Sequence, residues 1–330
     1  MLQEYLYAAL GLVILLLAGD ALVRGAVNLS LGLASPGLMA SRTVVAFGSS
    51  APDLVIAIVA GIAGAPDIAV GNVVGSNTAN VLLVLGIPAL LKGLETGDHD
   101  TRRSFVFMLA GSVWFIALAF WGPITWVHGL LLLAALAVVF ADQAREAQRH
   151  RKAGRSANDV LEHLEDLEEL EELEELEGAD PSMPWRRVAL YLVLGLAGLP
   201  LGADLLVDSG VNIATAWGVS ETVIGLTLIA VGTSLPELAT TVMAAYRRKA
   251  DVALGNVIGS NMFNLLGIIG VAALFGNIPV DNSFLRFDFW VMLGASVLLL
   301  PFVIYHIDMN RLLGAILTGL YAVYVLILLI

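Results

Sequence analysis

The chain has 330 residues, of which 58% are hydrophobic and only 14% are charged. Soluble globular domains carry about 25% charged residues, so the composition favours a helical membrane protein over a soluble enzyme. The sequence has no cysteine, which excludes a disulfide framework and a thiolate metal site. Its net charge of -12 comes mostly from one acidic segment, and we expect no nucleic-acid partner.

Ten apolar segments are candidates for crossing a bilayer core of about 30 Å, which takes roughly 20 residues of helix. The first has Glu4 where a secretory signal peptide carries lysine or arginine, so we expect it to be retained as a span. The predicted fold class is therefore an all-α membrane protein with ten transmembrane helices. The segments lie near 4–24, 37–62, 68–91, 104–121 and 123–141, and then near 187–207, 219–246, 252–275, 286–306 and 310–329.

The second group of five segments repeats the first. Residues 43–86 align without a gap to residues 227–270, and 18 of the 44 aligned positions are identical. The same offset of 184 relates Asp20 to Asp204 in the first span of each group. A duplicated pair of apolar segments, interrupted by glycine or proline at matching places, is typical of a transporter whose site lies between two repeats.

Lysine and arginine are concentrated in alternate loops, and Arg286 is the exception. Positive side chains stay on the cytoplasmic side, so we expect both termini outside a cell inner (plasma) membrane. Since each repeat has an odd number of spans, the second enters the membrane from the opposite side, which gives inverted topology with broken helices in each motif. The predicted organisation is a first repeat, 1–141, a cytoplasmic loop, 142–186, and a second repeat, 187–330.

The predicted loop is rich in leucine and glutamate. Leucine recurs at every third residue from Leu161 to Leu176, with Asp or Glu between, and no Lys or Arg occurs between Ser156 and Asp180. The apolar stripe of such a helix drifts around its surface. Two interpretations remain: a solvated helix or partly disordered linker, and a segment that binds a partner or senses cations.

Each repeat places a carboxylate, Asp53 or Glu237, directly after a Gly-Ser/Thr-Ser-x-Pro sequence. A carboxylate at bilayer depth costs about 2.5 to 3.5 kcal/mol on insertion scales, so both acids are functional candidates. Proline removes a backbone donor and clashes with the carbonyl four residues back. We therefore expect each helix to break beside its acid and to leave carbonyl oxygens available to a cation.

Oxygen is the only ligand type in these motifs. Ca²⁺ takes about 6 to 8 oxygen ligands, whereas zinc and copper prefer nitrogen or sulfur, so the residues predict a hard-cation site. Asn72, Asn77, Asn256 and Asn261 either bind ions or bridge helices. The candidate ion ligands are Ser49, Ser50, Asp53, Ser76, Asn80, Thr233, Ser234, Glu237, Ser260 and Asn264.

The motifs G-[ST]-S-x-P-[ED] and G-S-N-x-x-N, present in both repeats, resemble those of the cation/calcium antiporter superfamily, and of prokaryotic sodium/calcium exchangers in particular. The resemblance covers all ten predicted spans. It implies that the ten candidates line one divalent site and up to three sodium sites, that Na⁺ entry drives Ca²⁺ extrusion, and that the protein is no enzyme and needs no cofactor. Asp53 departs from the glutamate usual in bacterial members, and Asn264 from the aspartate of some relatives.

Three alternatives compete with Na⁺/Ca²⁺ exchange. Proton/calcium exchange is the nearest, because a desolvated carboxylate can carry a proton, but the serine and threonine beside each acid favour sodium. An intramembrane aspartyl protease needs a dyad that shares a proton, and no Gly-x-Gly-Asp accompanies these acids. A channel does not require the duplication. The sequence does not indicate an oligomeric state.

Overall fold

The computed structural model describes residues 2–32, 50–94, 101–154, 180, 182–246 and 250–330. Within these ranges the chain is helical apart from its connections and two isolated backbone bridges. The all-α class predicted from the sequence is therefore confirmed. Ser49 and most of the predicted acidic loop, residues 155–179, lie outside the described residues.

The described part of the first half begins with a long helix and continues through shorter ones. The span predicted at 37–62 is described only as a 13-residue apolar helix, because residues 33–49 are not among the described residues. The span predicted at 68–91 is one continuous helix with a π-helical turn in its middle. The elements are α1 (Leu2–Gly32), α3 (Ala51–Ala63), α4 (Pro66–Ala79), η1 (Asn80–Val84), α5 (Gly86–Lys92), α6 (Arg102–Ala119) and α7 (Trp126–Gly154).

The second half repeats this order. In the described chain, eight helices are long and apolar enough to cross a membrane, or nine if one bent pair forms a single span. The elements are α9 (Trp185–Trp217), α10 (Glu221–Ile224), η2 (Gly225–Ile229), α11 (Ala230–Thr233), α12 (Leu235–Tyr246), α13 (Ala250–Phe263), η3 (Asn264–Ile268), α14 (Ile269–Phe275), η4 (Phe284–Asp288), α15 (Phe289–Leu298), α16 (Leu300–Ile304) and α17 (Arg311–Leu328).

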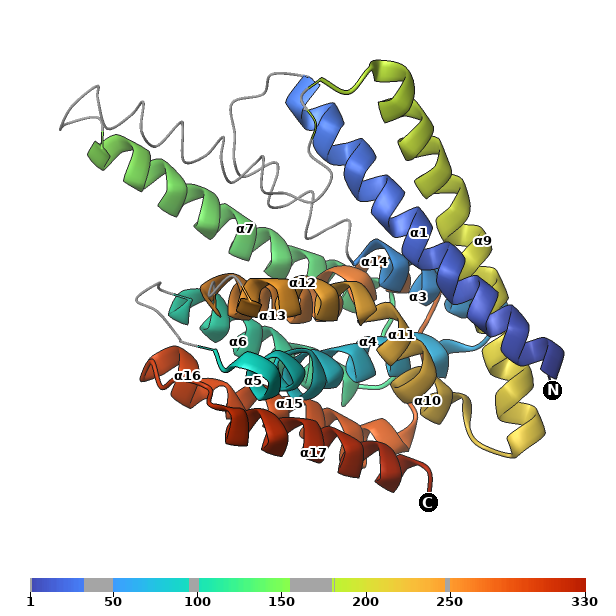
Figure 1. Ribbon diagram of the computed structural model, residues 1–330. Helices are drawn as coiled ribbons and strands as arrows, with labels where there is room; N and C mark the ends of the chain where they lie inside the picture. Colours follow the sequence, from blue (N-terminus) through green and yellow to red (C-terminus); the bar gives the residue numbers. More distant parts are fainter. Residues whose placement is uncertain (1, 33–49, 95–100, 155–179, 181, 247–249) are drawn as a thin grey trace.

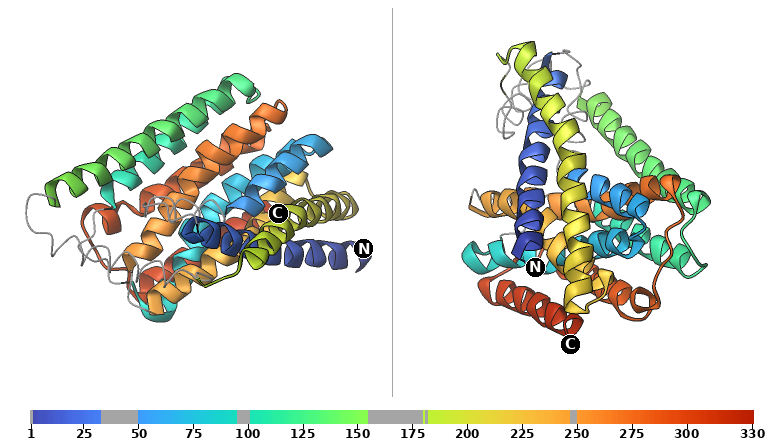
Figure 2. Two further views of the ribbon diagram at one scale, coloured as in Figure 1. Left: turned by 90° about the horizontal axis from the view of Figure 1, so that it is seen from above. Right: turned by 90° about the vertical axis from the view of Figure 1, so that its right-hand side faces the viewer.

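Helices α1 and α9 form an antiparallel pair that lies beside the bundle of the other helices and is steeply inclined to it (Figures 1 and 2). Glycines allow the close approach. A Cβ atom on Gly11 would lie 2.9 Å from the Leu206 nitrogen, and one on Gly195 would lie 2.6 Å from the Leu22 Cβ. The two contacts are related by the 184-residue offset, so the pair is close to two-fold symmetric.

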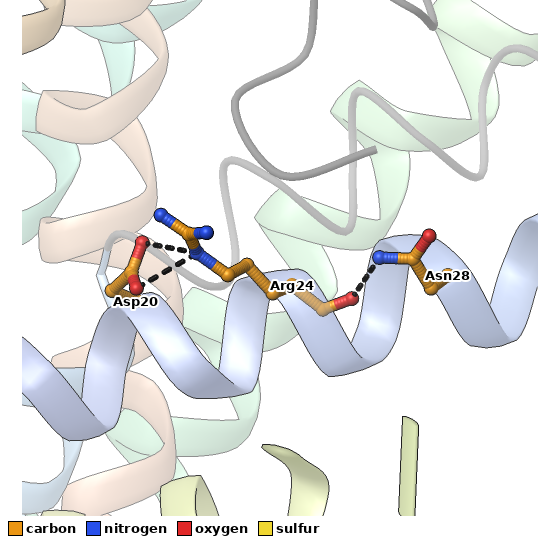
Figure 3. Close-up of polar contacts among 3 residues, drawn as sticks. All are labelled: Asp20, Arg24 and Asn28. Atoms are coloured by element: carbon orange, nitrogen blue, oxygen red, sulfur yellow. Dashed lines mark hydrogen bonds and ion pairs between the residues drawn. The ribbon is translucent and has the colours of Figure 1, made fainter. Parts of the chain in front are cut away.

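Helix α1 carries an ion pair in its second half. Arg24 forms an ion pair with Asp20, one turn before it, at 2.8 Å, as Figure 3 shows. One turn further, the Asn28 Nδ2 donates to the Arg24 carbonyl at 2.8 Å. The helix continues beyond the predicted end of the first span at residue 24, to Gly32.

The two halves exchange contacts in a reciprocal way. Helix α5 packs against α17, and its repeat counterpart α14 packs against α7 (Figure 1). A backbone bridge joins Leu94 to Met309 at one contact, and another joins Ile278 to Ile124 at the other. Each half therefore receives a helix from the other, and neither half packs as a separate unit.

Helix α7 continues beyond the predicted end of the fifth span at residue 141 and ends at Gly154. The extension is rich in alanine, glutamine, lysine and arginine, which are strong helix formers. An ion pair between Arg103 and Asp142 ties the start of α6 to this extension. The first part of the predicted loop 142–186 is therefore helical.

Candidate functional site

The second-repeat acid follows a break in its helix. The helix pair Glu221–Thr233 and Leu235–Tyr246 is bent by 42°, at the proline motif where the sequence predicts a break. Thr233, Ser234 and Glu237 around the bend are 1%, 3% and 3% exposed. The break therefore places two hydroxyls and a carboxylate together in the protein interior.

The first-repeat acid lies at a helix start. Asp53 is in the first turn of α3, where the partial positive charge of a helix N-terminus favours a carboxylate. Ser50 precedes the helix and accepts a backbone hydrogen bond from Leu54 at 3.1 Å. Both side chains are buried, at 0% exposure for Ser50 and 3% for Asp53.

Helix α4 brings the two acidic motifs together. A Cβ atom on Gly75 would lie 2.7 Å from the Leu226 carbonyl oxygen, so only glycine allows α4 to pack this closely on the second-repeat helix. Asn72, on α4, donates to the Asp53 carboxylate at 2.8 Å and accepts from Thr233 at 3.2 Å. Ser76, one turn further along, lies 3.4 Å from Thr233, oxygen to oxygen. A continuous hydrogen-bonded chain therefore links the first-repeat acid to the second-repeat bend.

Four asparagines form a second link between the repeats. Asn77 and Asn261 each donate to the backbone carbonyl of the other, at 3.0 and 3.2 Å. Asn80 donates to the Asn261 side chain, and Asn264 donates to the Asn77 side chain, both at 3.0 Å. Asn80 and Asn264 also begin the π-helical turns η1 and η3, a type of distortion often found at functional sites.

Several buried oxygens around these links have no donor among the described residues. They belong to the hydroxyls of Ser50 and Thr241 and to the side-chain amides of Asn80 and Asn264. Buried polar atoms in proteins are nearly always hydrogen-bonded, so an unmet acceptor suggests a bound species. The two amide oxygens can only accept and the two hydroxyls can also accept, so a cation suits this set beside the buried carboxylates. Within the described ranges no three His, Cys, Asp or Glu side chains gather, so this cluster depends on hydroxyl and amide oxygens.

The profile of the sodium/calcium exchanger protein family matches residues 4–141 and 187–330. These two ranges make up most of the chain. The protein belongs to the sodium/calcium exchanger family. The family is one of transporters that perform cation/Ca²⁺ antiport, and the chain is accordingly a multi-pass membrane protein.

Similarity to individual relatives extends over nearly the whole length of this exchanger. The sodium/calcium exchanger MaX1 of Methanosarcina acetivorans is 35% identical over 98% of both chains. The putative antiporter CaxA of Alkalimonas amylolytica is 35% identical over 91% of this chain and 89% of its own. Among solved structures, the sodium-calcium exchanger NCX_Mj soaked with Na⁺ and Ca²⁺ is 28% identical, with a TM-score of 0.60 over 98% of this chain and 97% of that one.

Nine of the ten ligand candidates in this exchanger are described, and all nine are buried, with exposures of 0% to 3%. Hydrogen bonds bring Asp53, Ser76 and Thr233 into one chain, and Asn80 and Asn264 into the other network. Ser260 lies on α13, one residue before Asn261.

The structure gives contacts to three asparagines whose role the sequence left open, and it adds Thr241 to the buried residues near the acids. Asn72 contacts an acid directly, and Asn77 and Asn261 bridge helices. Thr241 is not among the predicted ligands. Its position four residues after Glu237 places it on the same helix face as that acid, which is the signal that could have marked it as a candidate.

Proposed function

We propose that this exchanger is a secondary active antiporter that expels Ca²⁺ by admitting Na⁺. The observation that carries the proposal is the oxygen-only cluster between the repeats, in which Asp53 and Glu237 are each 3% exposed. Buried carboxylates are costly in a membrane unless a cation or proton offsets their charge. Oxygen ligands without nitrogen or sulfur favour Ca²⁺ and Na⁺ over transition metals.

We assign the ions to the ten residues predicted from the sequence. With both acids ionised the cluster has two formal negative charges, which one Ca²⁺ neutralises and three Na⁺ exceed by one. Exchange of three Na⁺ for one Ca²⁺ would therefore move net charge, and we expect transport to be electrogenic. The proposed ligands are Ser49, Ser50, Asp53, Ser76, Asn80, Thr233, Ser234, Glu237, Ser260 and Asn264.

Alternating access is the proposed mechanism. We infer ten spans in two inverted five-helix repeats, 1–141 and 187–330, which rock around the shared site. The antiparallel pairing of α1 with α9 and the reciprocal contacts of α5 and α14 support this inference. In this arrangement each repeat can adopt the conformation of the other, which opens the site to the opposite side.

The proposed orientation has both termini outside an inner (plasma) membrane and the segment 142–186 in the cytoplasm, from the distribution of lysine and arginine. The absence of native cysteine makes a direct test simple. A single cysteine at Gln3 should react with an impermeant thiol reagent applied to intact cells, and one at Ser156 should not. The reverse pattern would invert the topology.

Transport in proteoliposomes tests the proposal. Vesicles loaded with Na⁺ and diluted into Na⁺-free medium containing Ca²⁺ should accumulate Ca²⁺ at equal internal and external pH. An inside-positive potential that drives Na⁺ out should accelerate the uptake. Uptake that follows a pH gradient and ignores the Na⁺ gradient would replace the proposal with proton/calcium exchange.

A further inference from the structure

The four asparagines that link the repeats have a crossed arrangement. We propose that the inner pair, Asn77 and Asn261, fixes the orientation of the outer pair, Asn80 and Asn264, so that both outer amides present oxygen to the transported ions. The inner pair consists of positioning residues that do not themselves bind ions. This inference rests on the cation site proposed above.

The orientation of each amide follows from the backbone. A carbonyl oxygen can only accept, so Asn77 must direct its NH₂ group at the Asn261 carbonyl, 3.0 Å away. Its own side-chain oxygen is then turned to Asn264, which must donate its NH₂ group at 3.0 Å. The oxygen of Asn264 is therefore directed away from the pair.

The other half of the network follows the same logic. Asn261 directs its NH₂ group at the Asn77 carbonyl at 3.2 Å, and its oxygen accepts from Asn80 at 3.0 Å. All four side chains are buried, at 0% or 1% exposure. Both outer oxygens are buried without a donor among the described residues. The same result at two positions related by the repeat is difficult to explain as packing alone.

Orientation decides whether an asparagine attracts or repels a cation. The amide oxygen carries partial negative charge and ligates Ca²⁺ and Na⁺, whereas the NH₂ group carries partial positive charge and cannot. Rotation of an outer amide by half a turn would exchange a ligand for a repulsive group. The inner pair prevents this rotation, and it does so across the repeats, because Asn77 orients Asn264 and Asn261 orients Asn80.

Crossed coupling distinguishes this role from simple bracing of two helices. We would measure Ca²⁺ dissociation constants by calorimetry on the purified full chain. Asn77→Leu should weaken Ca²⁺ binding by about tenfold, the scale expected for losing one hydrogen bond to a charged species. In an Asn264→Ala background the same change should have no further effect. In an Asn80→Ala background it should again weaken binding by about tenfold.

The mirror variant provides an internal repeat of the test. Asn261→Leu should be silent in an Asn80→Ala background and fully effective in an Asn264→Ala background. An Asn264→Asp background adds a second check on Asn77→Leu, because a carboxylate presents oxygen whichever way it turns, and binding should then be insensitive to Asn77→Leu. The control is Asn212→Leu, which removes a bond to Glu4 between α9 and α1 and should leave Ca²⁺ affinity unchanged.

Equal effects of Asn77→Leu in all backgrounds, or coupling to Asn80 in place of Asn264, would overturn the inference. If Asn77→Leu does not fold, Asn77→Ser, which keeps a small polar group, replaces it in the same cycle. The readout is Ca²⁺ binding, so it is separate from the transport assay. Crossed coupling without Na⁺-driven transport would retain the positioning role and reject the proposed exchange.

Discussion

The two repeats of this exchanger share a backbone pattern, but they constrain their acids differently. In the first repeat, Asn72 donates directly to the Asp53 carboxylate at 2.8 Å. In the second, the equivalent Asn256 donates to the Thr240 hydroxyl at 3.2 Å. The first repeat has Ile56 at the position of Thr240 and so offers its asparagine no such alternative.

This difference shows how a duplicated scaffold can hold two unequal ligands. The amide bond fixes the shorter first-repeat carboxylate, and ligand groups that are ordered in advance lose less entropy when an ion binds. Thr240 itself donates to the Glu237 backbone carbonyl at 3.0 Å, so the second-repeat asparagine is coupled to the backbone of the bent helix. We therefore expect the repeats to make unequal contributions to ion affinity.

Removal of either carboxylate charge should have the largest effect on transport. Asp53→Asn and Glu237→Gln should each reduce Na⁺-driven Ca²⁺ uptake more than about 100-fold, because a dehydrated divalent ion needs both negative charges. Initial uptake rates in proteoliposomes measure the effect. The control is Asp20→Asn at an exposed position of α1, which should transport normally. Normal uptake by Asp53→Asn would remove the first repeat from the site.

Disturbing the packing of α4 on the second repeat should reduce transport nearly as strongly. Gly75→Ala places a methyl group 2.7 Å from the Ala230 Cβ and should destabilise the protein by about 1 to 3 kcal/mol, as overpacking does elsewhere. The melting temperature and the Ca²⁺ uptake rate should both fall. Gly61→Ala is the matched control, because no described atom lies within 4 Å of its new Cβ and the second repeat already has Ala245 there. Equal stability of the two variants would contradict this packing.

Substitution of Asn72 and of Asn256 tests whether the two repeats hold their acids differently. Asn72→Leu should raise the Ca²⁺ concentration for half-maximal uptake by about tenfold, since it removes a hydrogen bond to a charged group. Asn256→Leu, which loses only a bond to a neutral hydroxyl, should raise it by about threefold or less. Dose-response curves for the two variants give the ratio directly. The same increase in both would mean that the two repeats hold their acids alike during the transport cycle.

The smallest effect belongs to the exposed ion pair on α1. Arg24 and Asp20 form an exposed ion pair four residues apart, with side chains 36% and 51% exposed, and such pairs contribute about 0.3 to 0.5 kcal/mol. Asp20→Ala should therefore shift the unfolding midpoint only slightly, and the shift should vanish at high salt. A large loss of stability would mean that the ion pair also stabilises contacts between α1 and the rest of the protein.

Much of this molecule could be predicted from its sequence, because duplication and burial leave strong signals. Apolar length predicted the eight helices that are long enough to cross a membrane, and the proline motif predicted the bend before Glu237. The partners of Asn72 and Asn77 could not be predicted, since an asparagine that bridges helices has the same sequence pattern as one that binds an ion. The extension of α7 to Gly154 was missed because its residues are polar and still form helix. The span predicted at 37–62 is described only in part.

Competition between the two ions at the buried acids is the most direct test of the account. Calorimetric titration of the purified protein with Ca²⁺, repeated at increasing Na⁺ concentrations, measures it in a single series. If both ions share the site at these acids, Na⁺ weakens Ca²⁺ binding progressively and Asp53→Asn abolishes the binding. Ca²⁺ binding that is insensitive to Na⁺ and survives in Asp53→Asn would place the Ca²⁺ site elsewhere in the molecule.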